Sequence, residues 1–172
     1  GALQPGQSVL VQGASSGVGL TGLRIARLLS AGLVIGTSTT ASKRERLGEF
    51  GADLALDSGD PAWVDQVQAA TDGKGVDLAI DMLAGRLFNA TMAATRIGGR
   101  IVNVGRMAGE SGDVDFNLHS LRRITYVGVT FRTRSGREVA DLVQRARTDL
   151  GEAMASGALA LPVDSRFPLV EA

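Results

Sequence analysis

The segment from Gly13 to Gly19 reads Gly-Ala-Ser-Ser-Gly-Val-Gly and joins an apolar run, Ser8–Gln12, to an amphipathic run, Gly17–Ala31. These two patterns predict a buried strand followed by a helix. The first turn of a helix has unpaired N–H groups and a partial positive charge, so it attracts a pyrophosphate. The residues that we expect to hold one are Ser15, Ser16, Gly17, Val18 and Gly19.

The usual dinucleotide-binding fingerprint is G-x-G-x-x-G. The corresponding positions here are Ala14, Ser16 and Gly19, so small residues replace two of the three glycines. The bare motif is therefore weak, but its position between a predicted strand and a predicted helix favours dinucleotide binding. The alternative is a tight turn in another kind of α/β domain.

The next turn bears on the choice between NAD and NADP. NAD-binding domains place an acidic residue about 20 residues after the glycines, where it binds the ribose 2′-hydroxyl. Gly36–Thr40 contains no acid, and the hydroxyls of Ser38, Thr39 and Thr40 are followed by Lys43. Such donors suit a 2′-phosphate, so we expect NADP(H) to be preferred over NAD(H). Alternatively, Ser42 caps a helix whose first residues face solvent, and both interpretations can hold together.

The remaining patterns alternate strands with helices. This alternation predicts an α/β fold of the Rossmann type, a doubly wound parallel six-stranded sheet with helices on both faces. The expected strands are Ser8–Gln12, Leu33–Thr37, Leu54–Leu56, Val76–Asp81, Arg100–Gly105 and Ile124–Arg132. The expected helices are Gly17–Ala31, Ser42–Phe50, one with Pro61 in its first turn that ends near Ala70, Arg86–Thr95 ended by Gly98-Gly99, and Arg137–Ser156, with a polar loop at Met107–Asp115.

Composition argues against several classes of function. Lys and Arg total 18, as do Asp and Glu, so net charge gives no reason to expect nucleic acid or an anionic membrane as a partner. No apolar run approaches the roughly 20 residues that span a bilayer. The sequence has no cysteine, which excludes disulfides and thiolate zinc ligands within these residues and fits a cytoplasmic protein.

Two dehydrogenase families share features with these motifs. The Gly13–Gly19 loop also looks like the start of a short-chain dehydrogenase, but the Tyr-x-x-x-Lys pair of that family cannot be built, because Thr130 stands four residues after Tyr126. The chain instead resembles, along essentially its whole length, the cofactor-binding domain of the medium-chain dehydrogenase/reductase superfamily, in its quinone oxidoreductase and zinc-type alcohol dehydrogenase-like branches. The segments that carry the resemblance are Leu3–Val11, Ser15–Leu20, Gly36–Arg44, Gly51–Asp53, Gly73–Asp77, Asp81–Gly85, Gly98–Val102, Val104–Gly105 and Gly157–Leu169.

The resemblance implies further cofactor contacts. Met82 and Leu83 would flank the ribose, while Val104, Gly105 and Arg106 would approach the nicotinamide. Phe131 is a weaker candidate for the same end of the cofactor. The family also forms dimers through its last strand, so we expect a homodimer through Ile124–Phe131.

The resemblance places the chemistry outside these residues. Family members carry a GroES-like catalytic domain that supplies the substrate pocket and any zinc ligands, so we expect residues 1–172 to be a dinucleotide-binding domain from a longer polypeptide. We assign no catalytic residue and no metal ligand: Asp81 is expected to cap a turn, and His119 is the only histidine. The full protein would transfer hydride between NADPH and a small carbonyl, enone, quinone or alcohol. The alternatives are an enoyl-reductase module of a multidomain synthase and a non-catalytic nucleotide-binding or interaction domain.

Overall fold

The computed structural model describes residues 1–163 and 165–171. Six parallel strands form one sheet in the order β3-β2-β1-β4-β5-β6. The strands are β1 (Ser8–Gln12), β2 (Leu33–Thr37), β3 (Leu54–Leu56), β4 (Val76–Asp81), β5 (Thr95–Asn103) and β6 (Thr125–Gly128). The order reverses between β1 and β4, so the loops after these two strands diverge at the carboxyl edge and leave room for a ligand. The predicted doubly wound sheet is confirmed.

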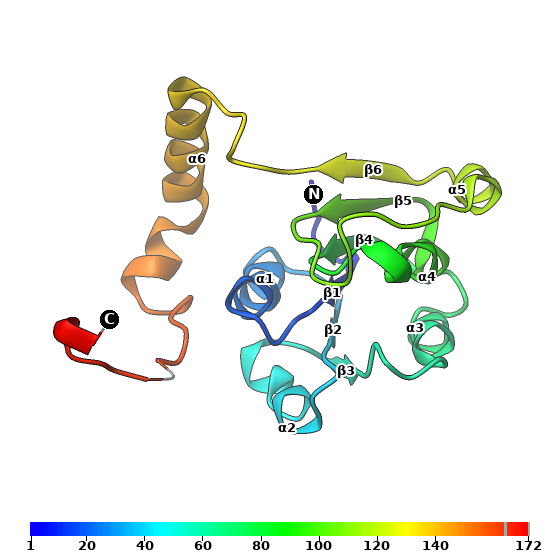
Figure 1. Cartoon of the computed structure of the whole chain (residues 1–172), viewed down its shortest axis with the longest axis horizontal. Coiled ribbons are helices and arrows are strands. Elements are labelled where there is room, and N and C mark those ends of the chain that lie inside the picture. The colour runs from blue at the N-terminus through cyan, green and yellow to red at the C-terminus, as the bar shows by residue number, and fades with distance from the viewer. Residues whose placement is uncertain (164, 172) are drawn as a thin grey trace.

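Helices cover both faces of this sheet (Figure 1). The helical elements are α1 (Gly17–Leu28), α2 (Ala41–Arg44), η1 (Leu47–Phe50), α3 (Trp63–Ala70), η2 (Gly85–Leu87), α4 (Phe88–Ala94), α5 (Phe116–Arg122), α6 (Gly136–Ala155) and η3 (Leu169–Glu171). α1 lies on one side of the strands, and α3, α4 and α5 lie on the other. α6 stands apart from the sheet and buries no residue.

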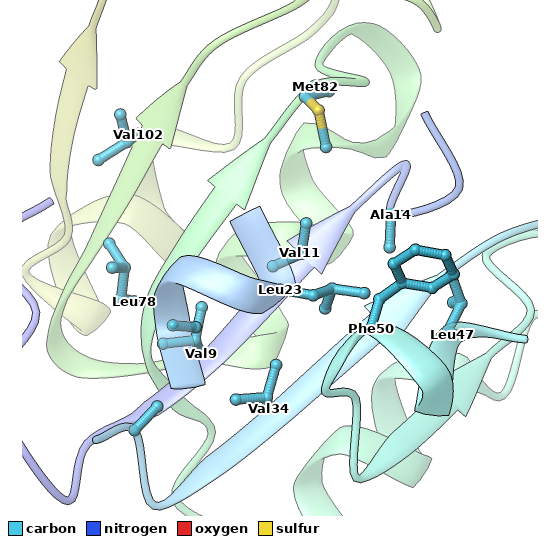
Figure 2. Packing of buried hydrophobic residues seen from close by; sticks show 12 residues of the cluster. Val9, Val11, Ala14, Leu23, Val34, Leu47, Phe50, Leu78, Met82 and Val102 are labelled. Carbon is cyan, nitrogen blue, oxygen red and sulfur yellow. The ribbon is translucent and has the colours of Figure 1, made fainter. Parts of the chain in front are cut away.

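The strand sequences supply a core to each face because successive side chains point to opposite sides. Val9 and Val11 of β1 pack with Leu23 of α1 and Phe50 of η1, in the cluster shown in Figure 2. Leu10, between the two valines, belongs to a second cluster. That second cluster also contains Ile35, Leu56, Trp63, Val67, Val76, Ala79, Phe88, Met92, Ile101 and Ile124.

Several predicted boundaries on the α1 side of the sheet are wrong. α1 ends at Leu28 rather than Ala31, and Ser30 takes a left-handed φ of 59° that stops the helix. The expected helix Ser42–Phe50 divides into α2 and η1, because a tighter 3-10 turn brings Leu47 and Phe50 into the core. Its N-cap is Thr40, not Ser42.

Boundaries around α3, α4 and β5 also differ from the prediction. Pro61 precedes α3 by two residues instead of occupying its first turn. Gly98 and Gly99 do not end α4: they lie inside β5, which starts at Thr95 and shifts its register against β4 between Val76 and Leu78. Glycine is common both at strand irregularities of this kind and at helix ends, so a Gly-Gly pair in the sequence does not distinguish the two.

The region after β5 holds the largest differences. The helix α5 was not predicted. It is capped by Asp115, whose side chain accepts a hydrogen bond of 2.8 Å from the Leu118 amide. The strand β6 is shorter than the predicted Ile124–Arg132, because the chain turns at Thr130–Arg134. Phe131 therefore lies on a turn and is 67% exposed.

Candidate cofactor-binding site

The loop between β1 and α1 is anchored to the end of β2 by a buried polar network. The Thr37 hydroxyl donates to Gln12 Oε1 at 2.7 Å and accepts from the Gly13 amide at 3.1 Å. The Ala14 amide donates to the Thr37 carbonyl at 2.8 Å. Gly13 takes a φ of 73°, a conformation that favours glycine. These bonds hold the loop at the carboxyl edge of the sheet before any ligand arrives.

Ser16 caps α1. Its hydroxyl oxygen accepts a hydrogen bond of 3.1 Å from the Gly19 amide and lies 2.9 Å from the Gly13 carbonyl oxygen. The amides of Gly17 and Val18 donate to no other residue in the described part of the chain. The first turn of α1 therefore has two N–H groups without an acceptor among the described residues, and N–H groups in this position can bind an anion.

We expect Ser16→Ala to lower the free energy of unfolding by about 1 kcal/mol, because the Gly19 amide loses its capping partner. The matched control is Thr40→Ala, since Thr40 occupies the N-cap of α2 without a side-chain hydrogen bond to it. Urea unfolding of both variants would measure the difference. Equal losses in the two variants would contradict the capping role of Ser16.

Gly19 of α1 packs tightly against the loop between β1 and α1. A Cβ atom at this position would lie 2.6 Å from the Ala14 Cα atom and 2.6 Å from the Gly13 carbonyl oxygen. Both contacts are with backbone, which cannot rotate away as a long side chain could. This position of the fingerprint therefore requires glycine in this structure, whereas Ala14 and Ser16 occupy the other two positions without such conflict.

A cleft of about 480 Å³ opens beside this loop, at the carboxyl ends of β1, β2 and β4. It brings together seven of the predicted residues: Ser15, Ser16, Ser38, Thr39, Thr40, Lys43 and Leu83. Gly13 and six residues outside the predicted site complete its lining: Ser58, Gly59, Arg86, Leu87, Met107 and Ala108. Lys43 and Arg86 supply positive charge, and no carboxylate is among the described residues that line the cleft.

The end of this cleft near β2 is rich in hydroxyls. Ser38 is buried and donates to the Ser15 hydroxyl at 3.0 Å. This bond links the turn after β2 to the loop between β1 and α1, which we call the phosphate loop. Arg44 donates to the Ser38 carbonyl at 2.7 Å and pairs with Asp57 at 3.1 Å, so its charge is already compensated. Lys43 is exposed and forms no ion pair with any described residue. Of these two cations, Lys43 is the one available to a ligand.

Asp81 ends β4 and caps the turn that follows it. Its Oδ1 accepts hydrogen bonds of 2.9 Å from the amides of Leu83 and Ala84, as expected from the sequence. Its Oδ2 is buried and has no hydrogen-bond partner among the described residues. Burial raises the pKa of this carboxyl above its ordinary value, and the two backbone hydrogen bonds oppose that rise.

The raised pKa of Asp81 predicts a pH dependence of stability. The folded chain holds this proton to a higher pH than the unfolded chain does, so the free energy of unfolding falls as the pH rises from the ordinary carboxyl value through the raised one. Urea unfolding between pH 4 and 7 should show the wild type losing stability relative to Asp81→Asn, in which the titration is absent. A difference that stays constant or grows with pH would contradict this assignment.

The other predicted residues lie elsewhere. Val104, Arg106 and Phe131 line a second cleft of about 500 Å³ between β5, β6 and α6. Met82 is buried, and its sulfur lies 3.4 Å from the Ser16 hydroxyl. Gly105 packs against the Met82 backbone, where a Cβ would meet the carbonyl oxygen at 2.8 Å.

Gly17 and Val18 are not among the residues that line the first cleft. They border an apolar hollow of about 690 Å³ on the α1 side of the sheet, and Val18 is 59% exposed. Their contribution to a phosphate site is therefore confined to their backbone amides.

The residues missed by sequence reasoning come from the segments that follow β3, β4 and β5. Met107 approaches the phosphate loop closely: a Cβ on Gly13 would lie 3.1 Å from its terminal carbon. The Met107 amide donates to the Met82 carbonyl at 3.1 Å, which fixes this loop beside the first cleft. The rule that ligands bind at the carboxyl ends of parallel strands was the one available signal for these loops.

The described residues do not form a metal centre. They contain no group of three or more His, Cys, Asp or Glu side chains that could hold an ion. His119 lies on α5, away from the residues that line the first cleft. In the same part of the chain, no helix combines the length and the apolar character needed to cross a bilayer.

Comparison with known proteins gives a consistent family. The sequence model of the family described as zinc-binding dehydrogenase matches residues 17–146. A highly reducing polyketide synthase of Aspergillus niger is 31% identical over 163 residues, which cover 87% of this chain and 6% of the synthase. A mycocerosic acid synthase-like polyketide synthase of Mycolicibacterium smegmatis is 27% identical over 174 residues, covering 99% of this chain and 8% of that protein.

Solved structures agree with this match. A mycobacterial protein in complex with NADPH superposes with a TM-score of 0.83 at 29% identity, covering 99% of this chain and 52% of that one. A 2-haloacrylate reductase gives a TM-score of 0.86 at 25% identity, covering 99% of this chain and 53% of the reductase. The chain thus spans about half the length of these structures and less than a tenth of the two synthases. It belongs to the zinc-binding dehydrogenase family and is a cofactor-binding domain of the medium-chain dehydrogenase/reductase superfamily.

Proposed function

We propose that this chain is the NADP(H)-binding domain of an oxidoreductase that transfers hydride between NADPH and a small carbonyl, enone, quinone or alcohol substrate. The observation that carries the proposal is the first cleft, where hydroxyls and two cations surround the start of α1 with no carboxylate among the described lining residues. A dinucleotide with an extra phosphate needs such donors and would be repelled by an acid. The solved relative in complex with NADPH supports the same choice.

The start of α1 and the first cleft beside it would each bind part of the cofactor. The Gly17 and Val18 amides at the start of α1 would hold the pyrophosphate, and Ser38, Thr39, Thr40 and Lys43 would hold the adenosine 2′-phosphate. Leu83 would pack against a ribose. The bound nicotinamide supplies or accepts the hydride. The role of this chain is to bind and orient the cofactor, and the substrate would be positioned mainly by a catalytic domain.

Zinc does not fit the described residues, despite the description of the family. The sequence has no cysteine, and the described side chains form no cluster of metal-binding residues. A zinc site in the parent protein would need ligands from a GroES-like domain. We therefore expect the 172 residues alone to bind NADP(H) without turning over substrate.

Titration of this chain with NADPH and with NADH, followed by nicotinamide fluorescence, tests the proposal. We expect saturable binding with a preference for NADPH, because only NADPH offers a phosphate to Lys43 and its hydroxyl neighbours. Binding of neither dinucleotide would reject the proposal and leave a non-catalytic interaction domain. Robust reductase activity of the isolated chain would reject the proposal that a separate catalytic domain is needed for turnover.

A second candidate is an enoyl-reductase module within a multidomain synthase. It is favoured by the curated relatives, among which polyketide synthases match this chain over only 6% or 8% of their own length. The residues flanking this chain in its full reading frame distinguish the candidates. Carrier or ketoreductase domains would indicate a synthase, whereas a single GroES-like domain of roughly 120 residues would indicate a separate reductase.

We also propose a homodimer through β6. This strand lies at the end of the sheet, all four of its residues are exposed, and its outer backbone groups are open to another strand. Light scattering at high protein concentration should give twice the mass of the chain, and a monomer under those conditions would count against the proposal. The parent protein is expected in the cytoplasm, which localisation of a tagged full-length protein would test.

A further inference from the structure

The second cleft, between β5, β6 and α6, combines an apolar wall with a cationic rim. Its volume is about 500 Å³. Val104 and Val129 directly follow β5 and β6, Phe131 lies in the turn after β6, and Leu142 lies on α6. Phe131 is 67% exposed although it borders this hollow, so an occupant could cover it.

Three arginines line the same cleft: Arg106, Arg132 and Arg134. Arg134 lies 3.9 Å from the Glu138 carboxylate, a loose pair. That carboxylate also accepts hydrogen bonds of 2.8 Å from the Ser135 amide and hydroxyl. Arg106 and Arg132 form no ion pair with any residue that the structure describes. The rim therefore carries more positive charge than its neighbours compensate.

Arg106 also lines a smaller cavity, of about 210 Å³. Glu110 and Asp113 line that cavity, but neither comes within ion-pair distance of Arg106. Even if both carboxylates reduce the field at Arg106, the charges of Arg132 and Arg134 remain on the second cleft. The excess of positive charge does not depend on Arg106 alone.

The turn that presents two of these arginines is held by its own hydrogen bonds. The Arg132 amide donates to the Thr130 hydroxyl at 3.2 Å, and the Arg134 amide donates to the Phe131 carbonyl at 3.2 Å. Arg134 Nε donates to the Thr130 carbonyl at 3.0 Å. These bonds fix the backbone of the turn and one nitrogen of the Arg134 side chain, and such preorganisation lowers the entropic cost of binding.

The dinucleotide does not account for this charge. Its phosphates have donors in the first cleft, around the start of α1 and around Lys43. The second cleft holds Val104, Arg106 and Phe131, the residues expected near the nicotinamide, a group that carries no negative charge. Arginine favours carboxylates and phosphates because its planar fork donates two parallel hydrogen bonds. The surplus of arginine thus indicates a second, anionic ligand.

We propose that the second cleft binds the oxyanion of a substrate that also has an apolar chain, with Arg132 and Arg134 gripping a carboxylate or a phosphate ester. The apolar wall of the cleft accommodates the chain beside the nicotinamide end of the cofactor. This inference rests on the proposed function and specifies its substrate class: an anionic amphiphile rather than a neutral quinone or alcohol.

Hexanoate, hexyl phosphate and neutral hexanol are suitable probes, each titrated against the full chain by calorimetry with and without saturating NADPH. We expect at least one of the two anions to bind about tenfold or more tightly than hexanol, as a charge-assisted contact would give. The relative strength of carboxylate and phosphate identifies the source of the oxyanion. Equal binding of all three probes, or binding of inorganic phosphate as tight as that of hexyl phosphate, would overturn the proposal.

Variants localise the effect. Arg132→Gln should weaken binding of the preferred anion about tenfold, while Arg145→Gln, on α6 but outside the lining of the cleft, should leave it unchanged. Phe131→Ala should weaken the hexyl compounds but not inorganic phosphate. If Arg132→Gln and Arg145→Gln bind the anion equally, the site is wrong. NADPH affinity measured on the same samples separates this failure from failure of the proposed function, because Arg132 does not line the first cleft.

Discussion

Replacing Lys43 by Asp should weaken NADPH binding by about 10–100-fold while changing the affinity for NADH little. Lys43 is exposed at the edge of the first cleft and has no ion-pair partner among the described residues, so its charge is available to a phosphate. One charge-assisted hydrogen bond contributes about 1.5–3 kcal/mol, which corresponds to that range of affinity. The carboxylate introduced in its place would repel the adenosine 2′-phosphate and tolerate a ribose hydroxyl.

Lys74→Asp is the matched control for this substitution. Lys74 is the only other lysine in the sequence, and it lies in an exposed turn before β4, outside the lining of the first cleft. Fluorescence titrations of both variants would separate a local effect from a general change in charge. If Lys43→Asp kept the wild-type ratio of NADPH to NADH affinity, the assignment of the 2′-phosphate site would be wrong.

Gly19→Ala should destabilise the chain by about 1–3 kcal/mol and abolish dinucleotide binding in the same variant. The added methyl group would lie 2.6 Å from the Ala14 Cα atom, so the phosphate loop must move away from α1. A shifted loop no longer aims the Gly17 and Val18 amides at one point. Thermal unfolding and an NADPH titration measure the two consequences.

Gly22→Ala provides the comparison on the same helix. A Cβ atom there would lie 3.7 Å from Val11 Cγ1, an ordinary contact. Replacing a helical glycine by alanine should stabilise α1 by up to about 1 kcal/mol, with NADPH binding retained. Similar destabilisation by both substitutions would mean that close packing at Gly19 is not what fixes the loop.

The local sequence pattern was sufficient to predict the first four strands and the loop that follows β1. The first four strands have the bounds predicted for them, because each is a short apolar run closed by residues that favour turns. The phosphate loop was equally predictable, since its glycines follow directly after β1 and its serine caps the helix that follows. In both cases the determining interactions lie within a few residues of one another.

Prediction failed where distant contacts decide the structure. Gly98 and Gly99 resemble a helix end, but pairing with β4 draws them into β5. The helix α5 was missed although Asp115 caps it, because contacts distant in the sequence attach this short helix to the rest of the fold. Leu118 packs on the core, and Arg122 donates to the Thr95 carbonyl at 2.7 Å. Met107 enters the first cleft from a loop far along the sequence from Gly13. Composition and spacing contain no direct signal for such approaches.

The grouping of arginines in the second cleft was likewise not predictable from the sequence. The sequence places Arg106 and Phe131 near the nicotinamide by family resemblance, yet it does not show that Arg132 and Arg134 share their cleft. That grouping depends on the early end of β6 and on the turn at Thr130–Arg134. The substrate class is therefore a structural inference rather than a sequence inference.

A crystal structure of this chain with NADPH tests the central claim most directly. The account predicts the pyrophosphate within hydrogen-bonding distance of the Gly17 and Val18 amides and the 2′-phosphate beside Lys43 and the hydroxyls of Ser38, Thr39 and Thr40. A dinucleotide bound elsewhere, or a first turn of α1 left empty at saturating NADPH, would contradict it.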